Sequence, residues 1–289
     1  MAIEHYYLTD RMRRIVKNAE LETRATGGVV NPEHLLIACF NEKKGALGEI
    51  SLKVKVNKDS IREAVSSEKT VLNQIETSSP VFKLPVTTDV IKILDLAKRY
   101  MNKYNQIMIN EGHLLKALIA TKQIDNILTK EDKELILSIG TTARDMITYL
   151  GEYTFPHIKS DINLIRKTSE KDCPRVVSFV NDNFSSGWAD TVENAFASFE
   201  SPPLYIAEEK DGTIIGFAGF DIYKNKKCYF GPMGIVSANR TKGVGYSLLH
   251  HCLKDMKKTG YEYAIIGEVG PIEFYEKVCN ATVIPSSHY

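Results

Sequence analysis

The chain has 289 residues, a usual length for two domains, and its hydrophobic (43%) and charged (25%) fractions are those of a folded globular protein. The formal net charge is +1 and neither half is strongly basic, so we expect no nucleic-acid partner. No apolar run approaches the roughly 18 residues that span a bilayer, and the first residues lack the features of a signal peptide. Five widely spaced cysteines without a C-x-x-C pair exclude a disulfide framework or a zinc ribbon. We therefore expect a cytoplasmic protein without a metal site or a membrane partner.

The first half contains a helical pattern that occurs twice. Residues 8–19 place apolar side chains at helical spacing, and Asn31-Pro32 then begins a second helix with a good N-cap and a proline at the first helical position. The same patterns return at 86–97 and around His113, which takes the place of His34. We expect both histidines to be fixed by hydrogen bonds rather than to bind a metal. A long segment that occurs twice indicates a duplicated helical unit.

The segments between and after these copies give the expected boundaries. Residues 69–85 contain two prolines and many polar side chains, so we interpret them as the connecting loop. Residues 130–150 are predicted to form a closing helix, and 151–160 a linker. The sequence thus predicts an all-α domain over 1–150 and a second domain over 161–289.

The second half alternates between short apolar runs and helical patterns. A helix is predicted at 243–258, where apolar residues share one face, and a shorter helix begins at Pro271. Lys210-Asp211-Gly212 is typical of a hairpin turn. Strands and helices in this order form an α/β layer around one sheet. The predicted strands are 162–165, 204–207, 213–223, 228–236, 263–267 and 282–284.

The segment Arg240-Thr241-Lys242-Gly243-Val244-Gly245 joins a predicted strand directly to the amphipathic helix. The first backbone N–H groups of a helix have no acceptor within it and carry partial positive charge, so they can bind a diphosphate. Gly243 and Gly245 leave room for such a ligand, and Arg240 and Lys242 add positive charge beside it. Two glycines alone are equally compatible with an ordinary connection between strand and helix.

The spacing Arg240-x-x-Gly243-x-Gly245 resembles the acyl-CoA-binding motif of the GCN5-related N-acetyltransferases, the GNAT family. The runs 231–236 and 270–277 are similar to the fourth strand of that family and to the helix that carries its usual tyrosine. The resemblance implies a GNAT fold with a mixed, mostly antiparallel sheet, and acetyl-CoA as the acyl donor. It also implies that the fourth strand separates from the fifth and pairs with pantetheine. The implied coenzyme-binding residues are Ile235, Val236, Arg240, Lys242, Gly243, Val244, Gly245 and Tyr246.

The same resemblance makes Tyr275 the candidate general acid for the coenzyme sulfur, because a phenol stays protonated at neutral pH and can donate to a thiolate. The base is left open, since residues 227–233 of the fourth strand contain no carboxylate. Glu268 and Asp221, each at the end of a predicted strand, are candidates, although a strand-end carboxylate is more often solvated surface. A water chain, or an amine that arrives neutral, would replace a dedicated base.

Other residues of this half are candidates for the acceptor side. Trp188 lies in the region where the GNAT family forms its acceptor wall, so we expect it to line the acceptor pocket; the alternative is a core tryptophan. His250 and His251 are adjacent on the amphipathic helix and point in different directions, which favours surface or core positions over a catalytic role.

The helical half resembles the N-terminal Clp repeat domain of Clp-type chaperone ATPases. The resemblance is carried by Thr9, by Glu33-His34-Leu35-Leu36 and by the corresponding His113-Leu114-Leu115. The chain has no G-x-x-x-x-G-K-[ST] motif, so we expect a docking domain for a protein or peptide without an ATPase. Some Clp proteins bind phosphorylated arginine with this threonine and glutamate, whereas Gly112 replaces the second glutamate here. The alternative is that Thr9 is only an N-cap and Glu33 only a favourable first-turn charge.

Two classes of function follow from these patterns. The first is an acetyl-CoA-dependent N-acetyltransferase in which a primary amine attacks directly in a ternary complex, with a helical docking domain attached. The second is a non-catalytic adaptor, or an acyl-CoA sensor, that binds protein partners through the Clp-like half. The sequence does not distinguish a small amine, an amino sugar, an antibiotic or a protein lysine as acceptor.

Overall fold

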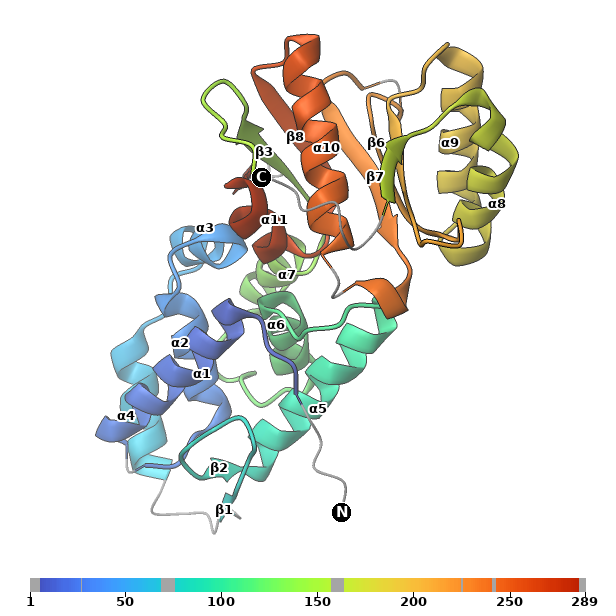
Figure 1. Ribbon diagram of the computed structural model, residues 1–289. Coiled ribbons are helices and arrows are strands. Elements are labelled where there is room, and N and C mark those ends of the chain that lie inside the picture. Colours follow the sequence, from blue (N-terminus) through green and yellow to red (C-terminus); the bar gives the residue numbers. More distant parts are fainter. Residues whose placement is uncertain are drawn as a thin grey trace. The chain divides into compact units, whose positions relative to one another are not determined.

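The computed structural model describes residues 6–26, 28–68, 76–156, 164–224, 226–240 and 243–285, which form two compact units (Figure 1). The first, which we call the helical unit, contains the chain up to Ala143 and the residues after Ile284. The second, the sheet unit, is Arg144–Ile284. Within the described ranges, no helix combines the length and the apolar composition that crossing a bilayer requires.

The helical unit contains the duplicated pattern that the sequence predicts. The pair α1 and α2 is repeated as α5 and α6, and each pair buries its periodic apolar residues in the core. The elements of this unit are α1 (Asp10–Glu22), the 3-10 turn η1 (Thr23–Ala25), α2 (Pro32–Asn41), α3 (Gly45–Lys53), α4 (Lys58–Glu68), β1 (Glu76–Thr77), β2 (Val86–Thr87), α5 (Thr88–Lys103), α6 (Glu111–Ala120) and α7 (Lys130–Gly140).

The second helix of each pair begins with the same local structure. The backbone N–H of Asn31 donates to Nδ1 of His34 at 3.0 Å, and that of Asn110 donates to Nδ1 of His113 at 3.1 Å. Burial lowers the pKa of His113 to about 4, which keeps its imidazole neutral and able to accept this bond. Both histidines therefore complete capping boxes, as expected from their sequence positions.

A buried arginine joins the two copies. Arg11 of α1 is 1% exposed and forms an ion pair with Glu111 of α6, while its Nε lies 4.0 Å from Glu42. Isolated bridges between the copies, Leu8 with Ile109 and Val30 with Val86, add backbone pairing. The duplicated halves thus form one core rather than two.

The predicted helix over 130–150 is wrong in its second half. α7 ends at Gly140, and strand β3 (Arg144–Tyr149) follows. This strand pairs antiparallel with β8 (Tyr263–Val269) and with β9 (Thr282–Val283). Burial alternates along it in the period of a strand, not of a helix. The sheet unit therefore begins within the range predicted for the first domain.

The segment predicted as a linker, 151–160, also differs from expectation where it is described. The hydroxyl of Tyr153 donates to the carbonyl of Val278 at 3.1 Å, and Phe155 packs against the core of the sheet unit. Residues 157–160 lie outside the described residues. Residues 151–156 are thus a packed part of the sheet unit.

The sheet has seven strands in the order β4-β5-β6-β7-β8-β3-β9. β7 and β8 are parallel and the other neighbours are antiparallel, which confirms the predicted mixed, mostly antiparallel sheet. Residues 162 and 163 of the first predicted strand lie outside the described residues. The remaining strands are β4 (Leu164–Lys167), β5 (Leu204–Glu208), β6 (Ile214–Phe220) and β7 (Tyr229–Ile235).

Helices cover the two faces of this sheet (Figure 1). The 3-10 turn η2 (Glu170–Asp172) leads into α8 (Cys173–Asn183), which packs with α9 (Ser186–Ser198) on the face that contains Phe217; we call this the α8 face. The 3-10 turn η3 (Ser237–Asn239) precedes α10 (Val244–Thr259), which packs with α11 (Ile272–Cys279) on the face that contains Phe230, the α10 face. The amphipathic pattern predicted at 243–258 accounts for α10.

Candidate active site

Strands β7 and β8 pair over two positions and then separate. Tyr229 lies opposite Ile265 and Phe230 opposite Ile266, after which no further pairs join the two strands in the described residues. On its other side β7 pairs with β6, where Met233 lies opposite Ala218 and Phe230 opposite Phe220, so β7 contains one extra residue between them. Such a bulge turns a strand away from its neighbour. We call the divergence of β7 and β8 beyond Phe230 the strand fork.

The N-terminus of α10 follows β7 after the 3-10 turn η3, at the open end of the strand fork. Gly243 is its N-cap with φ of 76°, a left-handed conformation that glycine adopts without strain. A Cβ at Gly243 would meet nothing within 4 Å, whereas one at Gly245 would lie 3.0 Å from Cδ1 of Ile235. Gly243 thus leaves open space at the helix end, and Gly245 allows α10 to lie close to β7.

The structure describes one of the two basic residues of the motif, Arg240. Nε of Arg240 donates to the carbonyl of Ile235 at 3.2 Å, and burial lowers the pKa of this guanidinium. Arg240 is therefore held at the end of β7, beside the N-terminus of α10. Lys242 and Thr241 lie outside the described residues.

The two residues expected to pair with pantetheine, Ile235 and Val236, differ in the direction of their backbone N–H groups. The N–H of Val236 donates to the carbonyl of Ile215 on β6 at 3.0 Å, so it is already used within the sheet. Ile235 lies opposite Gly216, and the bond from Val236 to Ile215 shows that these two residues form a pair without hydrogen bonds between them. The N–H of Ile235 therefore points away from β6. Of the two, Ile235 presents a donor on the strand-fork side.

Tyr275 of α11 lies next to the point where the strands separate. Its ring is 7% exposed and packs edge-on against Phe230, with 6.4 Å between ring centroids. Burial raises the pKa of its hydroxyl, which keeps the phenol protonated. Among the described residues the hydroxyl has no hydrogen-bond partner. The position fits a proton donor on the α10 face of the strand fork.

The two carboxylates considered as bases have other partners. Glu268 is exposed at the end of β8, where it accepts from the Tyr223 hydroxyl at 3.2 Å and pairs with Nζ of Lys224 at 3.3 Å. Asp221 follows β6 and accepts from the Tyr261 hydroxyl at 2.6 Å, beyond the closed end of the strand fork. Neither carboxylate contacts Tyr275 or α10.

A third carboxylate, that of Asp145, was not predicted from the sequence. It lies on β3, and its Oδ1 accepts from the Tyr229 hydroxyl at 3.2 Å and from the backbone N–H of Glu268 at 2.8 Å. The segment 130–150 was predicted to be one helix, which hid this residue. The run Ile147-Thr148-Tyr149, rich in β-branched and aromatic side chains after Gly140, was the signal available for a strand.

Trp188 lies on the α8 face, as its sequence position suggests. It is half-buried at the start of α9 and packs against Phe184, with 5.7 Å between ring centroids. Phe184 in turn covers Gly234 of β7, where a Cβ would lie 2.5 Å from the ring. An aromatic wall therefore borders β7 on this face, just beyond the bulge.

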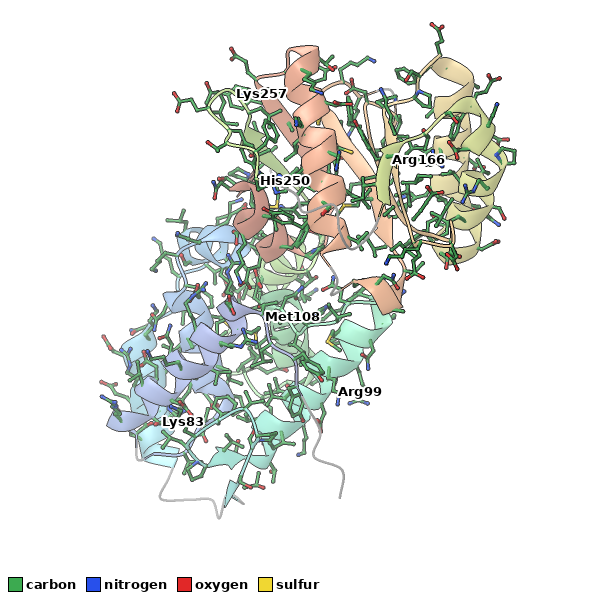
Figure 2. All side chains as sticks on the ribbon, in the orientation of Figure 1. Lys83, Arg99, Met108, Arg166, His250 and Lys257 are labelled. Atoms are coloured by element: carbon green, nitrogen blue, oxygen red, sulfur yellow. The ribbon has the colours of Figure 1, made fainter. Side chains whose placement is uncertain are left out.

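The two histidines of α10 have different surroundings. His250, labelled in Figure 2, is 1% exposed, and its Nδ1 lies 3.4 Å from the Tyr153 hydroxyl. Burial lowers its pKa to about 4. It borders a cavity of about 470 Å³ between α10, the end of α11 and residues 148–156, to which Tyr246 also contributes. His251 packs against Tyr205 instead.

In the helical unit, the structure accounts for the missing second glutamate. Thr9 is the N-cap of α1, and its hydroxyl accepts from the N–H of Met12 at 3.3 Å, while Glu33 lies in the first turn of α2. A Cβ on Gly112 would lie 2.6 Å from the carbonyl oxygen of Gly140, so no side chain fits there. The packing of α6 against α7 thus leaves no room for a glutamate side chain at this position of the second copy.

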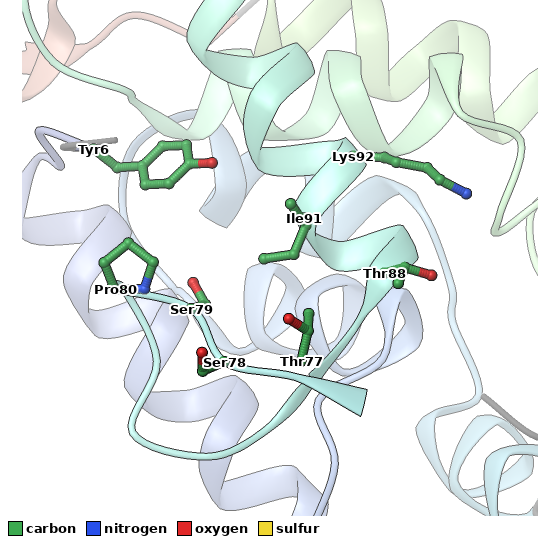
Figure 3. Close-up of a pocket in the computed structure, with 8 residues that line it drawn as sticks. All are labelled: Tyr6, Thr77, Ser78, Ser79, Pro80, Thr88, Ile91 and Lys92. Carbon is green, nitrogen blue, oxygen red and sulfur yellow. The ribbon is translucent and has the colours of Figure 1, made fainter. Parts of the chain in front are cut away.

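The helical unit also has a surface hollow of about 690 Å³ at the N-terminus of α5 (Figure 3). Five of its eight lining residues carry hydroxyl groups, and neither Thr9 nor Glu33 belongs to it. Its lining residues are Tyr6, Thr77, Ser78, Ser79, Pro80, Thr88, Ile91 and Lys92. In the described part of the chain, no group of three or more histidine, cysteine or acidic side chains is arranged to hold a metal ion.

Family models match each unit separately. Residues 7–131 match the model of the Clp repeat (R) N-terminal domain, and residues 173–280 match that of the acetyltransferase (GNAT) family. Both resemblances expected from the sequence are thereby confirmed. A comparison with curated proteins gave no match.

Three solved structures illustrate the likeness of fold. A GCN5-related glucosamine N-acetyltransferase region in a fungal multi-domain beta-N-acetylglucosaminidase is similar over 50% of this chain and 20% of that chain, with 15% identity and a TM-score of 0.44. The GNAT protein YhbS from Escherichia coli, in complex with CoA, is similar over 38% and 63%, with 19% identity and a TM-score of 0.30. The N-terminal domain of the chaperone ClpD from Arabidopsis thaliana is similar over 48% and 96%, with 20% identity and a TM-score of 0.36. The chain thus spans less than two thirds of the first two proteins.

Proposed function

We propose that the sheet unit transfers the acetyl group of acetyl-CoA to a primary amine, and that the helical unit docks a protein or peptide partner. The observation that carries this proposal is the strand fork with the glycine-capped N-terminus of α10 at its open end. The GNAT match over residues 173–280 and the Clp repeat match over residues 7–131 support the two assignments.

The coenzyme diphosphate fits the first turn of α10. The N–H groups of Val244, Gly245 and Tyr246 have no acceptor within the helix, and the open space at Gly243 admits an anion to them. Arg240 and Lys242 supply positive charge. The N–H of Ile235 lies on the open edge of β7, where it can donate a hydrogen bond to an extended chain, as it would to a further strand.

Transfer by direct attack requires a proton donor for the departing thiolate. The coenzyme supplies a thioester, and attack by the amine forms the C–N bond as the C–S bond breaks. Tyr275 is the donor, because its buried phenol stays protonated. Burial also raises the pKa of the Cys279 thiol to about 12, so this cysteine of α11 is a poor nucleophile. These two observations favour a ternary complex over an acyl-cysteine intermediate.

Calorimetry with acetyl-CoA tests coenzyme binding. Gly243→Val and Gly245→Leu should abolish the heat of binding, because one adds strain and bulk at the helix end and the other forces α10 from β7. Gly187→Ala on α9 is the matched control, since a Cβ there meets nothing within 4 Å. No heat with the unmodified protein would indicate the non-catalytic adaptor.

Release of free thiol in the presence of amines then tests turnover. The expected result is thiol release that depends on both acetyl-CoA and an amine, and that falls with Tyr275→Phe while the coenzyme affinity is retained. Coenzyme binding without thiol release from any amine would indicate an acyl-CoA sensor.

A further inference from the structure

The two faces of the strand fork carry different chemistry. Side chains alternate along a strand, so Tyr229 points to the α8 face when Phe230 packs on the α10 face against Tyr275. The Tyr229 ring lies directly over Gly267 of β8, where a Cβ would overlap it. Tyr275, the proposed proton donor for sulfur, therefore lies on the α10 face, and the Tyr229 phenol, hydrogen-bonded to the Asp145 carboxylate, lies on the α8 face.

Asp145 is the carboxylate of that second side. Its Oδ1 is occupied by the Tyr229 hydroxyl at 3.2 Å and the Glu268 N–H at 2.8 Å. Its Oδ2 has no partner and no cation among the described residues. Glu268, by contrast, is already paired with Lys224. Asp221 also has an oxygen without a partner, its Oδ1, but that oxygen is buried and lies beyond the closed end of the strand fork, whereas Asp145 offers Oδ2 beside Tyr229.

Two lysine side chains lie over the aromatic rings beside Asp145. Nζ of Lys224 lies 4.6 Å from the Tyr223 ring centroid, and Nζ of Lys226 lies 4.3 Å from that of Tyr229. The two tyrosine rings stack on each other with 5.9 Å between centroids. Because these lysines already occupy the two ring faces, an incoming ammonium group would be held by Oδ2 of Asp145 and not by an aromatic face. Farther along β7, Phe184 and Trp188 offer apolar surface to the rest of an acceptor.

We infer that Asp145 binds the acceptor as an alkylammonium ion on the α8 face and takes its proton before attack. The inference rests on the proposed acetyltransferase function. The ammonium group gives one proton to Asp145, which later releases it to water. The neutral nitrogen attacks the thioester carbon, the C–N bond forms and the C–S bond breaks. Tyr275 protonates the thiolate and regains a proton from water, and the nitrogen gives its second proton to water as the amide forms, so one net proton is released per turnover.

This role predicts a specific pH profile in the unmodified protein. If the carboxylate and the ammonium ion are the reacting forms, kcat/KM for an alkylamine should be flat between about pH 6.5 and 8.5, below the usual amine pKa near 10. If the amine must arrive neutral, kcat/KM should instead rise tenfold per pH unit over this range. A tenfold rise per unit in the unmodified protein would overturn the inference without any variant.

Asp145→Asn tests the residue itself, since the amide oxygen still accepts from Tyr229 and from the Glu268 N–H. We expect kcat/KM for an alkylamine to fall about 100-fold or more at pH 7 and then to rise tenfold per pH unit. An aniline, which is neutral at pH 7, should lose much less. Glu262→Gln, at an exposed position before β8, is the charge-matched control.

The outcomes distinguish the role of Asp145 from the proposed acetyltransferase function. Coenzyme affinity unchanged in Asp145→Asn, together with the predicted loss for alkylamines, supports the inference. Unchanged turnover and an unchanged pH profile in Asp145→Asn overturn it and leave the acetyltransferase proposal intact. No coenzyme binding by the unmodified protein refutes the proposed function, and the inference with it.

Discussion

Strand β3 should be essential to the sheet unit although it precedes the GNAT-matched range. Met146 is 0% exposed and packs in the core of the α10 face, and the strand lies between β8 and β9. Met146→Ala removes buried atoms from a filled core, and such changes cost about 2–5 kcal/mol. Because a domain has about 5–15 kcal/mol of stability, this is a large fraction of the free energy of unfolding of the sheet unit.

The single tryptophan provides a local readout. Trp188 lies in the sheet unit, so urea denaturation followed by its fluorescence reports the unfolding of that unit alone. Met146→Ala should lower the urea midpoint of this transition without a change in slope. The matched control is Ile147→Ala, because the adjacent side chain is only half-buried; we expect a loss of about 1 kcal/mol.

Equal midpoints for Met146→Ala and the unmodified protein would refute the assignment of β3 to this core. A pair of fragments makes the same test more strongly. Residues 144–289 should give a cooperative transition, whereas residues 161–289, which lack β3 and expose the edge of β8, should not fold. Cooperative folding of the shorter fragment with coenzyme binding would be equally decisive against the assignment.

Three further predictions concern single positions. Arg11→Ala should destabilise the helical unit by about 3–5 kcal/mol, measured by circular dichroism in urea, because it leaves Glu111 buried without its cation. Gly112→Glu should lower the helical unit's melting temperature, measured by circular dichroism, because its Cβ would lie 2.6 Å from the Gly140 carbonyl oxygen. Burial lowers the pKa of His250 to about 4, so the unfolded chain binds this proton first as pH falls. The sheet unit should therefore lose up to about 3 kcal/mol of stability between pH 6.5 and 4, and His250→Gln should flatten that part of its urea-midpoint profile.

Local signals in the sequence were sufficient for much of the fold. The caps at Asn31 and Asn110 and the periodic apolar residues define helices whose structure depends on near neighbours. The glycines at 243 and 245 likewise mark a strand-to-helix connection, although the structure shows that Gly245 also serves packing against Ile235. In each case the physical cause lies within a few residues of the signal.

Long-range pairing explains what was missed. β3 is six residues long and follows a helix, and its partner β8 is more than a hundred residues away in the chain. The position of Asp145 beside Tyr229 depends entirely on that pairing. The direction of the Val236 N–H similarly depends on register with β6. Spacing within one segment does not contain this information.

The short distance along the chain between α7 and β3 has a consequence for any docked partner. Only residues 141–143 separate Gly140 from Arg144, and three residues reach about 10 Å when fully extended. If the helical unit docks a protein as proposed, that protein would be tethered to the sheet unit at the roughly millimolar effective concentration that is typical of short linkers. Under the proposed function, a weakly recognised lysine on such a docked protein would be modified far more readily than the same lysine on a free protein.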